Sequence, residues 1–84
     1  MYKVILSNRV QKSIKGLPDD YVFKIHQKLS SLSFNPRPLG CVKLASSESH
    51  YRIRVGVYRV IYSIKDDILV VEVIKVDHRR NVYR

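Results

Sequence analysis

The sequence predicts an α+β domain in which a short strand and a helical hairpin precede a mainly antiparallel sheet of sequential strands. In the first half of the chain, apolar residues recur at helical spacing, whereas the second half contains runs rich in Val, Ile and Tyr that are separated by short turns. No repeat, linker or low-complexity tract interrupts residues 1–84, so we expect a single domain.

The N-terminal elements follow from capping and breaker residues. Residues 2–6 favour a short strand, and Ser7 or Asn8 is a suitable N-cap for the helix that follows. Gly16 is expected to end this helix in a left-handed conformation. The apolar face of the helix consists of Val10 and Ile14.

A second helix is expected to begin around residues 18–20, because proline suits a first turn and the two aspartates suit the positive end of the helix dipole. The breaker segment 35–40 ends it. Four residues form its apolar stripe: Val22, Ile25, Leu29 and Leu32.

The second half has the pattern of β-strands. A strand is plausible at 41–44 and a polar loop at 45–49. Gly56-Val57 and Asp66-Asp67 are spaced as tight hairpin turns. These turns separate the three predicted strands 51–55, 58–65 and 68–76.

The first hairpin places arginines together. With Gly56-Val57 as central turn residues, strand alternation puts Arg52, Arg54 and Arg59 on one face, with Arg54 directly opposite Arg59. Like charges across an antiparallel pair oppose folding by up to about 1 kcal/mol. Two interpretations remain: a solvated face, or a face that meets phosphate. The other face carries the predicted core residues Tyr51, Ile53, Val55, Tyr58, Val60, Tyr62 and Ile64.

The second hairpin brings a carboxylate toward this face. With Asp66-Asp67 as central turn residues, Ile61 pairs with Glu72 and Arg59 with Ile74, so Glu72 lies diagonal to Arg59. Glu72 either neutralises part of the arginine cluster or acts as a catalytic carboxylate.

Composition limits the class of function. Sixteen Lys and Arg against seven Asp and Glu give a net charge of +9, which favours a polyanionic partner. No apolar run is long enough to span a membrane, and the single Cys41 has no disulfide partner, so we expect a cytoplasmic protein. We also expect no cofactor or metal, because the sequence contains no metal-ligand spacing and no glycine-rich phosphate loop.

The C-terminal segment 77–84 holds three arginines, one histidine and one tyrosine. Arginine interleaved with aromatic rings suits RNA, because guanidinium groups hold phosphates and rings stack on splayed bases. The alternative is a solvated basic terminus.

The residues Tyr51-Arg52-Ile53-Arg54-Val55-Gly56-Val57-Tyr58-Arg59-Val60-Ile61-Tyr62, with the tail His78-Arg79-Arg80-Asn81-Val82-Tyr83, resemble a RelE-type toxin of the RelE/ParE superfamily. The resemblance covers nearly the whole chain. It implies a RelE-like fold and the toxin of a type II toxin–antitoxin pair, which cleaves mRNA in the ribosomal A site without a metal. Its implied partners are a cognate antitoxin, the ribosome and mRNA, with operator DNA bound only through the antitoxin complex.

The resemblance also implies site residues. Arg59, Arg79 and Tyr83 match catalytic positions, with Tyr83 as a base or a stacking ring and Arg79 beside the scissile phosphate or leaving group. RNA and phosphate binding is assigned to Arg52, Arg54, Lys43 and Arg80. His78 and Glu72 are alternatives for acid–base catalysis, although His78 also fits a structural position at a strand end. Two other functions stay open: a ParE-like gyrase poison, and a non-catalytic nucleic-acid-binding module or inactive toxin remnant.

Overall fold

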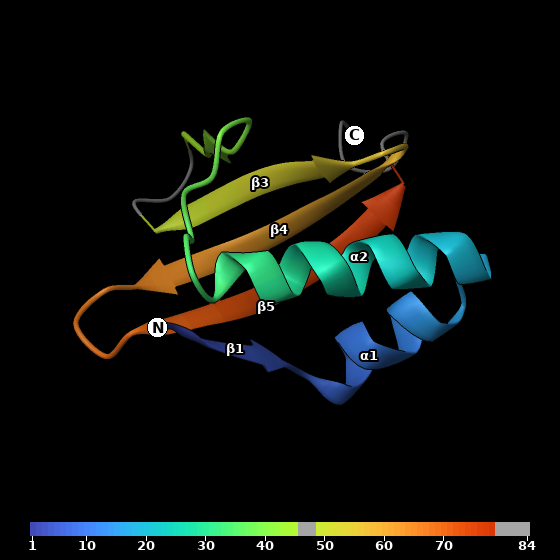
Figure 1. Ribbon diagram of the computed structural model, residues 1–84, viewed down its shortest axis with the longest axis horizontal. Helices are drawn as coiled ribbons and strands as arrows, with labels where there is room; N and C mark the ends of the chain where they lie inside the picture. Colours follow the sequence, from blue (N-terminus) through green and yellow to red (C-terminus); the bar gives the residue numbers. More distant parts are fainter. Residues whose placement is uncertain (46–48, 79–84) are drawn as a thin grey trace.

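A five-stranded mixed sheet is the frame of the molecule (Figure 1). The computed structural model describes residues 1–45 and 49–78. The elements follow in the order β1 (Lys3–Leu6), α1 (Asn8–Lys15), α2 (Asp19–Leu32), β2 (Val42–Lys43), β3 (His50–Val55), β4 (Tyr58–Lys65) and β5 (Val70–His78). The strand order is β1-β5-β4-β3-β2; β1 runs parallel to β5, and the other neighbours are antiparallel. The predicted α+β class is confirmed.

Helix α1 begins at the predicted cap but ends differently. The Ser7 hydroxyl accepts a hydrogen bond from the Val10 N–H at 3.2 Å. Gly16 is the C-cap, but its φ of −78° is right-handed, so the expected left-handed conformation is wrong. The reason is that the chain continues in a tight turn, in which the Leu17 N–H donates to the Ile14 carbonyl at 3.0 Å.

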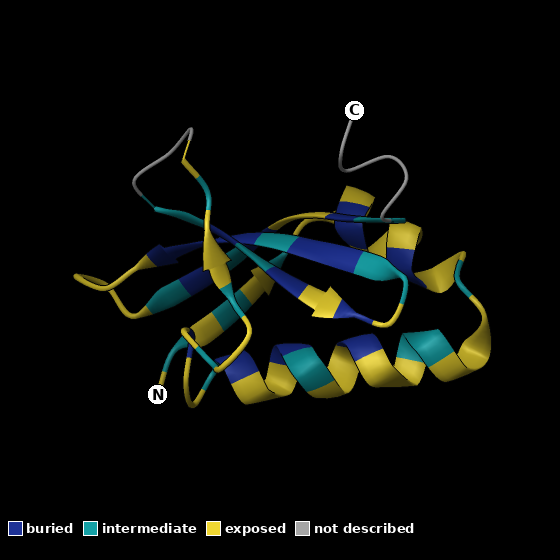
Figure 2. Cartoon of the chain, turned by 90° about the horizontal axis from the view of Figure 1, so that it is seen from above, coloured by how far each residue is buried: buried dark blue, intermediate teal, exposed yellow. Residues whose placement is uncertain are grey.

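Helix α2 spans one face of the sheet, and α1 packs beside β5 (Figure 1). The α2 side turned to the sheet is buried and its outer side is exposed (Figure 2). Ile25, Leu29 and Leu32 of the predicted stripe are buried, and Val22 is half-buried. Within the described residues, neither helix is long and apolar enough to cross a membrane.

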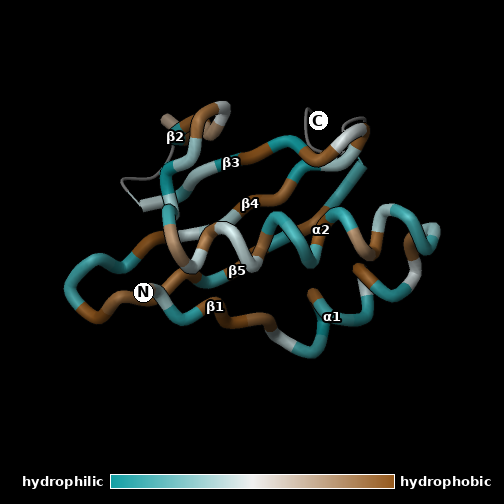
Figure 3. The backbone as a smooth tube through the Cα atoms, viewed as in Figure 1, coloured by the Kyte–Doolittle hydropathy of each residue, from teal (hydrophilic) through white to brown (hydrophobic). Residues whose placement is uncertain are grey.

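The first hairpin has the predicted register. Val55 pairs with Tyr58 and Arg54 with Arg59 across the turn at Gly56. Hydrophobic and hydrophilic residues alternate along β3 (Figure 3). Six of the seven predicted core residues in this hairpin are buried, and Tyr58 packs against them while half-buried.

The second hairpin differs from the prediction. Its turn has four residues, 66–69, rather than two, because Lys65 pairs with Val70. Leu69 takes a left-handed φ of 53° to close this turn. A register shift between Ile61 and Tyr62 then moves the pairing again, and β5 runs over Val70–His78 instead of 68–76.

The predicted strand 41–44 is shorter in the structure. Only Val42 and Lys43 form β2, and they pair with Arg52 and Tyr51 of β3. In the described part of the chain, β2 therefore covers the start of the β3 edge and leaves the backbone from Ile53 onward outside this pairing.

Candidate nucleic-acid interface

The three arginines of the first hairpin lie on the sheet face opposite the buried core residues. Arg54 is exposed, Arg52 is half-buried and Arg59 is 3% exposed. Because Arg54 and Arg59 are direct cross-strand partners, their Cβ atoms are expected about 4.5–5.5 Å apart. The sheet thus holds two guanidinium groups side by side.

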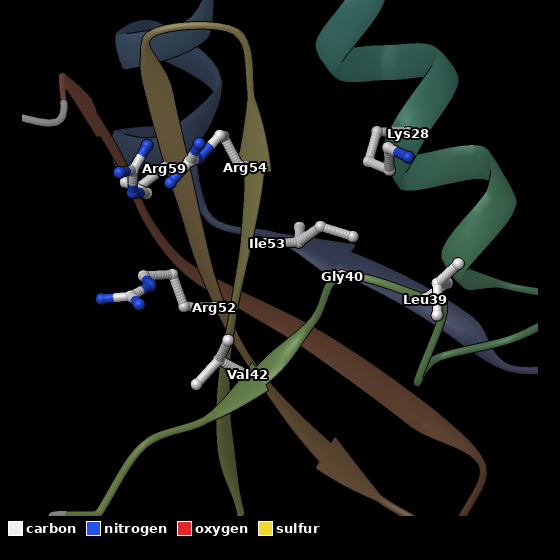
Figure 4. Close-up of a pocket in the computed structure, with 8 residues that line it drawn as sticks. All are labelled: Lys28, Leu39, Gly40, Val42, Arg52, Ile53, Arg54 and Arg59. Atoms are coloured by element: carbon white, nitrogen blue, oxygen red, sulfur yellow. The ribbon is translucent and has the colours of Figure 1, made fainter.

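A cavity of about 300 Å³ opens beside these arginines at the edge of β3 (Figure 4). The guanidinium groups extend to one side of the hairpin, and Lys28 approaches from α2 on the other. Four of the described residues that line it carry a positive charge, and none of them is a carboxylate. Its lining consists of Lys28, Leu39, Gly40, Val42, Arg52, Ile53, Arg54 and Arg59.

Asp77 is the acidic residue that the β4–β5 register places opposite Arg59. One of its carboxylate oxygens lies 3.3 Å from Lys75 Nζ, and the other accepts the His78 backbone N–H at 2.8 Å. Sequence reasoning missed Asp77 because the assumed two-residue turn put Ile74 in that position. A signal existed: the inward residues Val71, Val73 and Val76 are spaced two and then three apart, as a bulge requires.

Glu72 lies away from this site. It pairs with Ser63 rather than Ile61, and its carboxylate lies 3.6 Å from Lys65 Nζ. The expected position diagonal to Arg59 is therefore wrong, because the longer turn and the bulge shift the whole strand. In this position Glu72 offsets the charge of Lys65.

His78 and Lys43 occupy positions apart from the arginine cluster. The His78 ring packs edge-to-face on Tyr58, with ring centres 5.6 Å apart, and the two residues are direct strand partners. Tyr58 belongs to the core side of β4, so this contact favours the structural interpretation of His78. Lys43 is exposed, pairs with Tyr51 and is not among the residues that line the cavity.

The predicted tail residues Arg79, Arg80 and Tyr83 lie outside the described residues. Their roles in binding and catalysis stay predictions.

The turn of the first hairpin, next to Arg54 and Arg59, packs against helix α2. Gly56 has a left-handed φ of +60°, and an added Cβ would lie 2.6 Å from Cε1 of Tyr21 in α2. Tyr21 in turn packs edge-to-face on Tyr58, with ring centres 4.8 Å apart. The first turn of α2 therefore holds the end of the hairpin that carries Arg54 and Arg59.

A second polar cluster lies at the other end of β4. Arg37 donates to both Asp66 oxygens, at 3.1 and 2.7 Å, and its Nε donates to the Tyr51 hydroxyl at 3.2 Å. The Tyr2 hydroxyl donates to Asp66 Oδ1 at 2.6 Å. Hydrogen bonds from Arg37, and secondly from Tyr2, lower the pKa of Asp66 to about 2. Burial raises the pKa of the neighbouring Tyr62, whose hydroxyl donates to the Pro36 carbonyl at 2.8 Å.

Among the residues that the structure describes, no three His, Cys, Asp or Glu side chains gather as ligands for a metal ion. The chemistry that this surface offers comes from its fixed cations. Guanidinium groups stay protonated and bind phosphate oxygens in a forked geometry.

The chain is thus a small α+β domain with a cavity at one sheet edge that is lined by three arginines and one lysine. Residues 4–83 match the family "ParE toxin of type II toxin-antitoxin system, parDE". The chain belongs to this family, within the RelE/ParE superfamily of toxins, and is RelE-like.

Similar proteins support this placement. The chain is 29% identical over 86 residues to "Putative toxin RelE1" of Methanocaldococcus jannaschii, covering 99% of this chain and 96% of that protein. The archaeal RelE–RelB complex of Pyrococcus horikoshii matches with a TM-score of 0.84 and 29% identity, over 93% of this chain and 94% of the other. The isolated E. coli RelE toxin matches with a TM-score of 0.80 and 26% identity, over 93% and 84% of the two chains.

Proposed function

We propose that this toxin is a ribosome-dependent endoribonuclease that cleaves mRNA in the ribosomal A site and so inhibits translation. The observation that carries the proposal is the cavity lined by Arg52, Arg54 and Arg59, whose lining among the described residues includes no carboxylate. A folded chain places two arginines in direct opposition only at a cost, and a phosphate between them removes that cost. Similarity to RelE toxins supports the same activity.

The proposed reaction is transesterification within the RNA strand. The 2′-oxygen attacks the adjacent phosphorus and loses its proton, a P–O bond forms through a phosphorane, and the bond to the 5′-oxygen breaks. The departing 5′-oxygen takes up a proton. The protein must therefore stabilise the extra negative charge on the phosphorane and help both proton transfers.

The described arginines suit the electrostatic part of this task. Arg54, which is exposed and lines the cavity, contacts the phosphate first, while the buried Arg59 lies directly across the strand pair from it. Arg52 extends the same surface toward β2. We assign the proton transfers to the tail residues Tyr83 and Arg79, with Lys43 and Arg80 as further RNA contacts.

A translating extract tests the proposal. Purified toxin is added, mRNA ends are mapped, and wild type is compared with Arg59→Ala and with a Tyr83→Ala variant. Lys12→Gln, on α1, removes one charge away from the cavity and serves as the matched control. Cuts within codons that depend on Arg59 and Tyr83 are expected. Intact mRNA at a normal translation rate would refute the proposal.

A gyrase poison is the second candidate, because the matching family description names parDE toxins. Gyrase-dependent DNA breaks without mRNA cleavage would establish it instead. The third candidate, a non-catalytic binding module or toxin remnant, requires salt-sensitive RNA binding with neither cleavage nor growth inhibition.

A cognate antitoxin is the partner that we propose for this chain in the cytoplasm. Solved structures of similar toxins include complexes with RelB from Pyrococcus horikoshii and E. coli. The net charge of +9 favours an acidic partner segment over the cationic surface. Co-expression with the neighbouring gene's product should yield a stable complex in which mRNA cleavage is blocked.

A further inference from the structure

One side of the cavity is not used by the predicted site. Lys28, Leu39, Gly40 and Val42 line it together with the arginines (Figure 4). These residues come from α2, from the turn after it and from β2. The cavity therefore continues from the arginine face past the β3 edge to α2.

Lys28 is in an unusual environment for a lysine of this chain. It follows Ile25 by one helical turn and precedes the buried Leu29, so its stem lies at the border of the core. The ion pairs of the described residues join Arg37 to Asp66, Lys65 to Glu72 and Lys75 to Asp77, and none involves Lys28. Lys28 is half-buried, whereas seven lysines are exposed: Lys3, Lys12, Lys15, Lys24, Lys43, Lys65 and Lys75.

The apolar wall of the cavity is exposed to solvent. Leu39 is 102% exposed and Val42 is 47% exposed. Their positions are fixed: the Cys41 N–H donates to the Pro38 carbonyl at 3.1 Å, and Val42 pairs with Arg52 of β3. Gly40 has a φ of +94°, and an added Cβ there would meet nothing within 4 Å. The turn thus presents open apolar surface next to the cations.

We propose that this side of the cavity is a subsite for one further nucleotide of a single-stranded RNA. Lys28 holds the phosphate of that nucleotide, and its base lies on Leu39 and Val42. The inference rests on the RNA binding in the proposed function, since the neighbouring nucleotide occupies the arginines, and it does not depend on cleavage.

A nucleotide fits this side better than the alternatives. The cavity volume of about 300 Å³ is at the small end of the roughly 300–1,000 Å³ typical of ligand sites. An anion with a flat apolar part matches a lysine beside exposed Leu and Val. Continuity with three arginines favours a ligand whose charges repeat along its length, and a nucleic-acid strand has one phosphate per nucleotide. An acidic partner segment is the competing occupant, which the experiment below separates.

The test measures binding of a short single-stranded RNA by fluorescence anisotropy over a salt series, without ribosomes. The RNA carries 2′-O-methyl groups so that it cannot be cleaved. Wild type is compared with Lys28→Gln, Lys28→Arg and the matched charge control Lys12→Gln. Lys28→Gln should weaken binding several-fold and reduce the slope of log affinity against log salt by about 0.7, the value for one phosphate of a single strand. Lys28→Arg should restore the slope, and Lys12→Gln should leave it unchanged.

The base contact is tested with Leu39→Ser and an RNA that has one abasic position. Leu39→Ser should weaken binding of the intact RNA about fivefold and have no effect on binding of the RNA whose abasic nucleotide occupies the subsite. Equal slopes for Lys28→Gln and Lys12→Gln would overturn the subsite, as would equal effects of Leu39→Ser on both RNAs. If Lys28→Gln and Leu39→Ser weaken binding of the antitoxin's acidic segment but leave RNA binding unchanged, the cavity is assigned to the antitoxin instead.

Cleavage by the same variants in the translating extract separates the two proposals. If wild type cleaves mRNA and Lys28→Gln both binds and cleaves like wild type, the subsite is refuted and the endonuclease stands. If wild type leaves mRNA intact while the Lys28-dependent slope persists, the endonuclease is refuted and the subsite stands.

Discussion

The two ends of β4 hold arginines in opposite electrostatic settings. Beyond its C-terminal end, Arg37 forms a bidentate pair with Asp66, and the guanidinium carbon lies 5.3 Å from the centre of the Tyr51 ring. Near its N-terminal end, Arg59 lies opposite Arg54, beside a cavity whose described lining includes four cations and no carboxylate. One cluster consists of an arginine bonded to a carboxylate, and the other brings two arginines into direct opposition beside a cavity.

The difference predicts which cations contribute to folding and which contribute to the proposed RNA binding. A neutralised guanidinium with two bonds to one carboxylate joins the 33–38 segment to the β4–β5 turn, and it adds little net charge. The direct opposition of Arg54 and Arg59 instead opposes folding, because like charges across an antiparallel pair repel each other. We therefore expect substitutions at the two ends to separate stability from activity.

The largest expected effect is on activity at the cationic end. Arg54→Gln removes a cation that lines the cavity and that we propose to contact the scissile phosphate, so mRNA cleavage in the translating extract should fall about 10²–10³-fold. The free energy of unfolding should stay the same or rise by up to about 1 kcal/mol, because the like-charge pair with Arg59 is relieved. Urea denaturation measures this change in the free energy of unfolding. Undiminished cleavage by Arg54→Gln, or a clear loss of its stability, would contradict the proposed difference between the two ends of β4.

A smaller effect is expected where the hairpin meets α2. Gly56→Ala should lower the free energy of unfolding by about 1–2 kcal/mol, because alanine disfavours a φ of +60° and its Cβ would displace Tyr21. Cleavage per folded molecule should also fall, because the turn aligns Arg54 with Arg59. Gly40→Ala is the stability control: it has a φ of +94° but no atom within 4 Å of the added Cβ. Equal stability losses in the two variants would mean that the Tyr21 contact contributes nothing.

At the end of β4 where Arg37 pairs with Asp66, we expect a substitution to lower stability and leave cleavage unchanged. Arg37→Gln removes both bonds to Asp66 and the contact with Tyr51, and should lower the melting temperature by a few degrees. The effect is modest because the Arg37 and Asp66 side chains are 43% and 55% exposed. Cleavage per folded molecule should equal that of wild type. A loss of cleavage in correctly folded Arg37→Gln would place Arg37 in the RNA-binding surface.

The sequence was sufficient for the first hairpin and insufficient for the second. Gly56 allows the left-handed conformation of a two-residue turn, and strict alternation from Tyr51 to Ile64 admits one register, so the positions of Arg52, Arg54 and Arg59 could be predicted. In the second hairpin, Asp66-Asp67 resembles a two-residue turn. The structure instead uses Leu69 with a positive φ, and no local preference of leucine indicates this.

The cavity was beyond sequence reasoning for a different reason. Lys28 and Gly40 are twelve residues apart in the chain, and Arg59 is nineteen residues further on, so only tertiary packing brings them together. Helical spacing places Lys28 beside the core stripe, but it does not reveal that the β3 edge lies opposite. Asp77 was missed through the register error, which changed the partner of Arg59.

The smallest expected effect is the pH dependence of the neutralised cluster. The pKa of Asp66 is lowered from 3.8 to about 2, so the unfolded chain binds a proton at this carboxyl more readily than the folded one. The stabilisation is fully present above about pH 4 and is lost as the pH falls from 3.8 toward 2. Urea midpoints from pH 2 to 6 should therefore converge for wild type and Asp66→Asn at the acid end and separate above pH 4. Asp67→Asn makes the same charge change in the same turn but removes neither the Arg37 nor the Tyr2 bond. Identical profiles for the two variants would show that Arg37 gains nothing from Asp66, and the contrast between the ends of β4 would then be one of geometry alone.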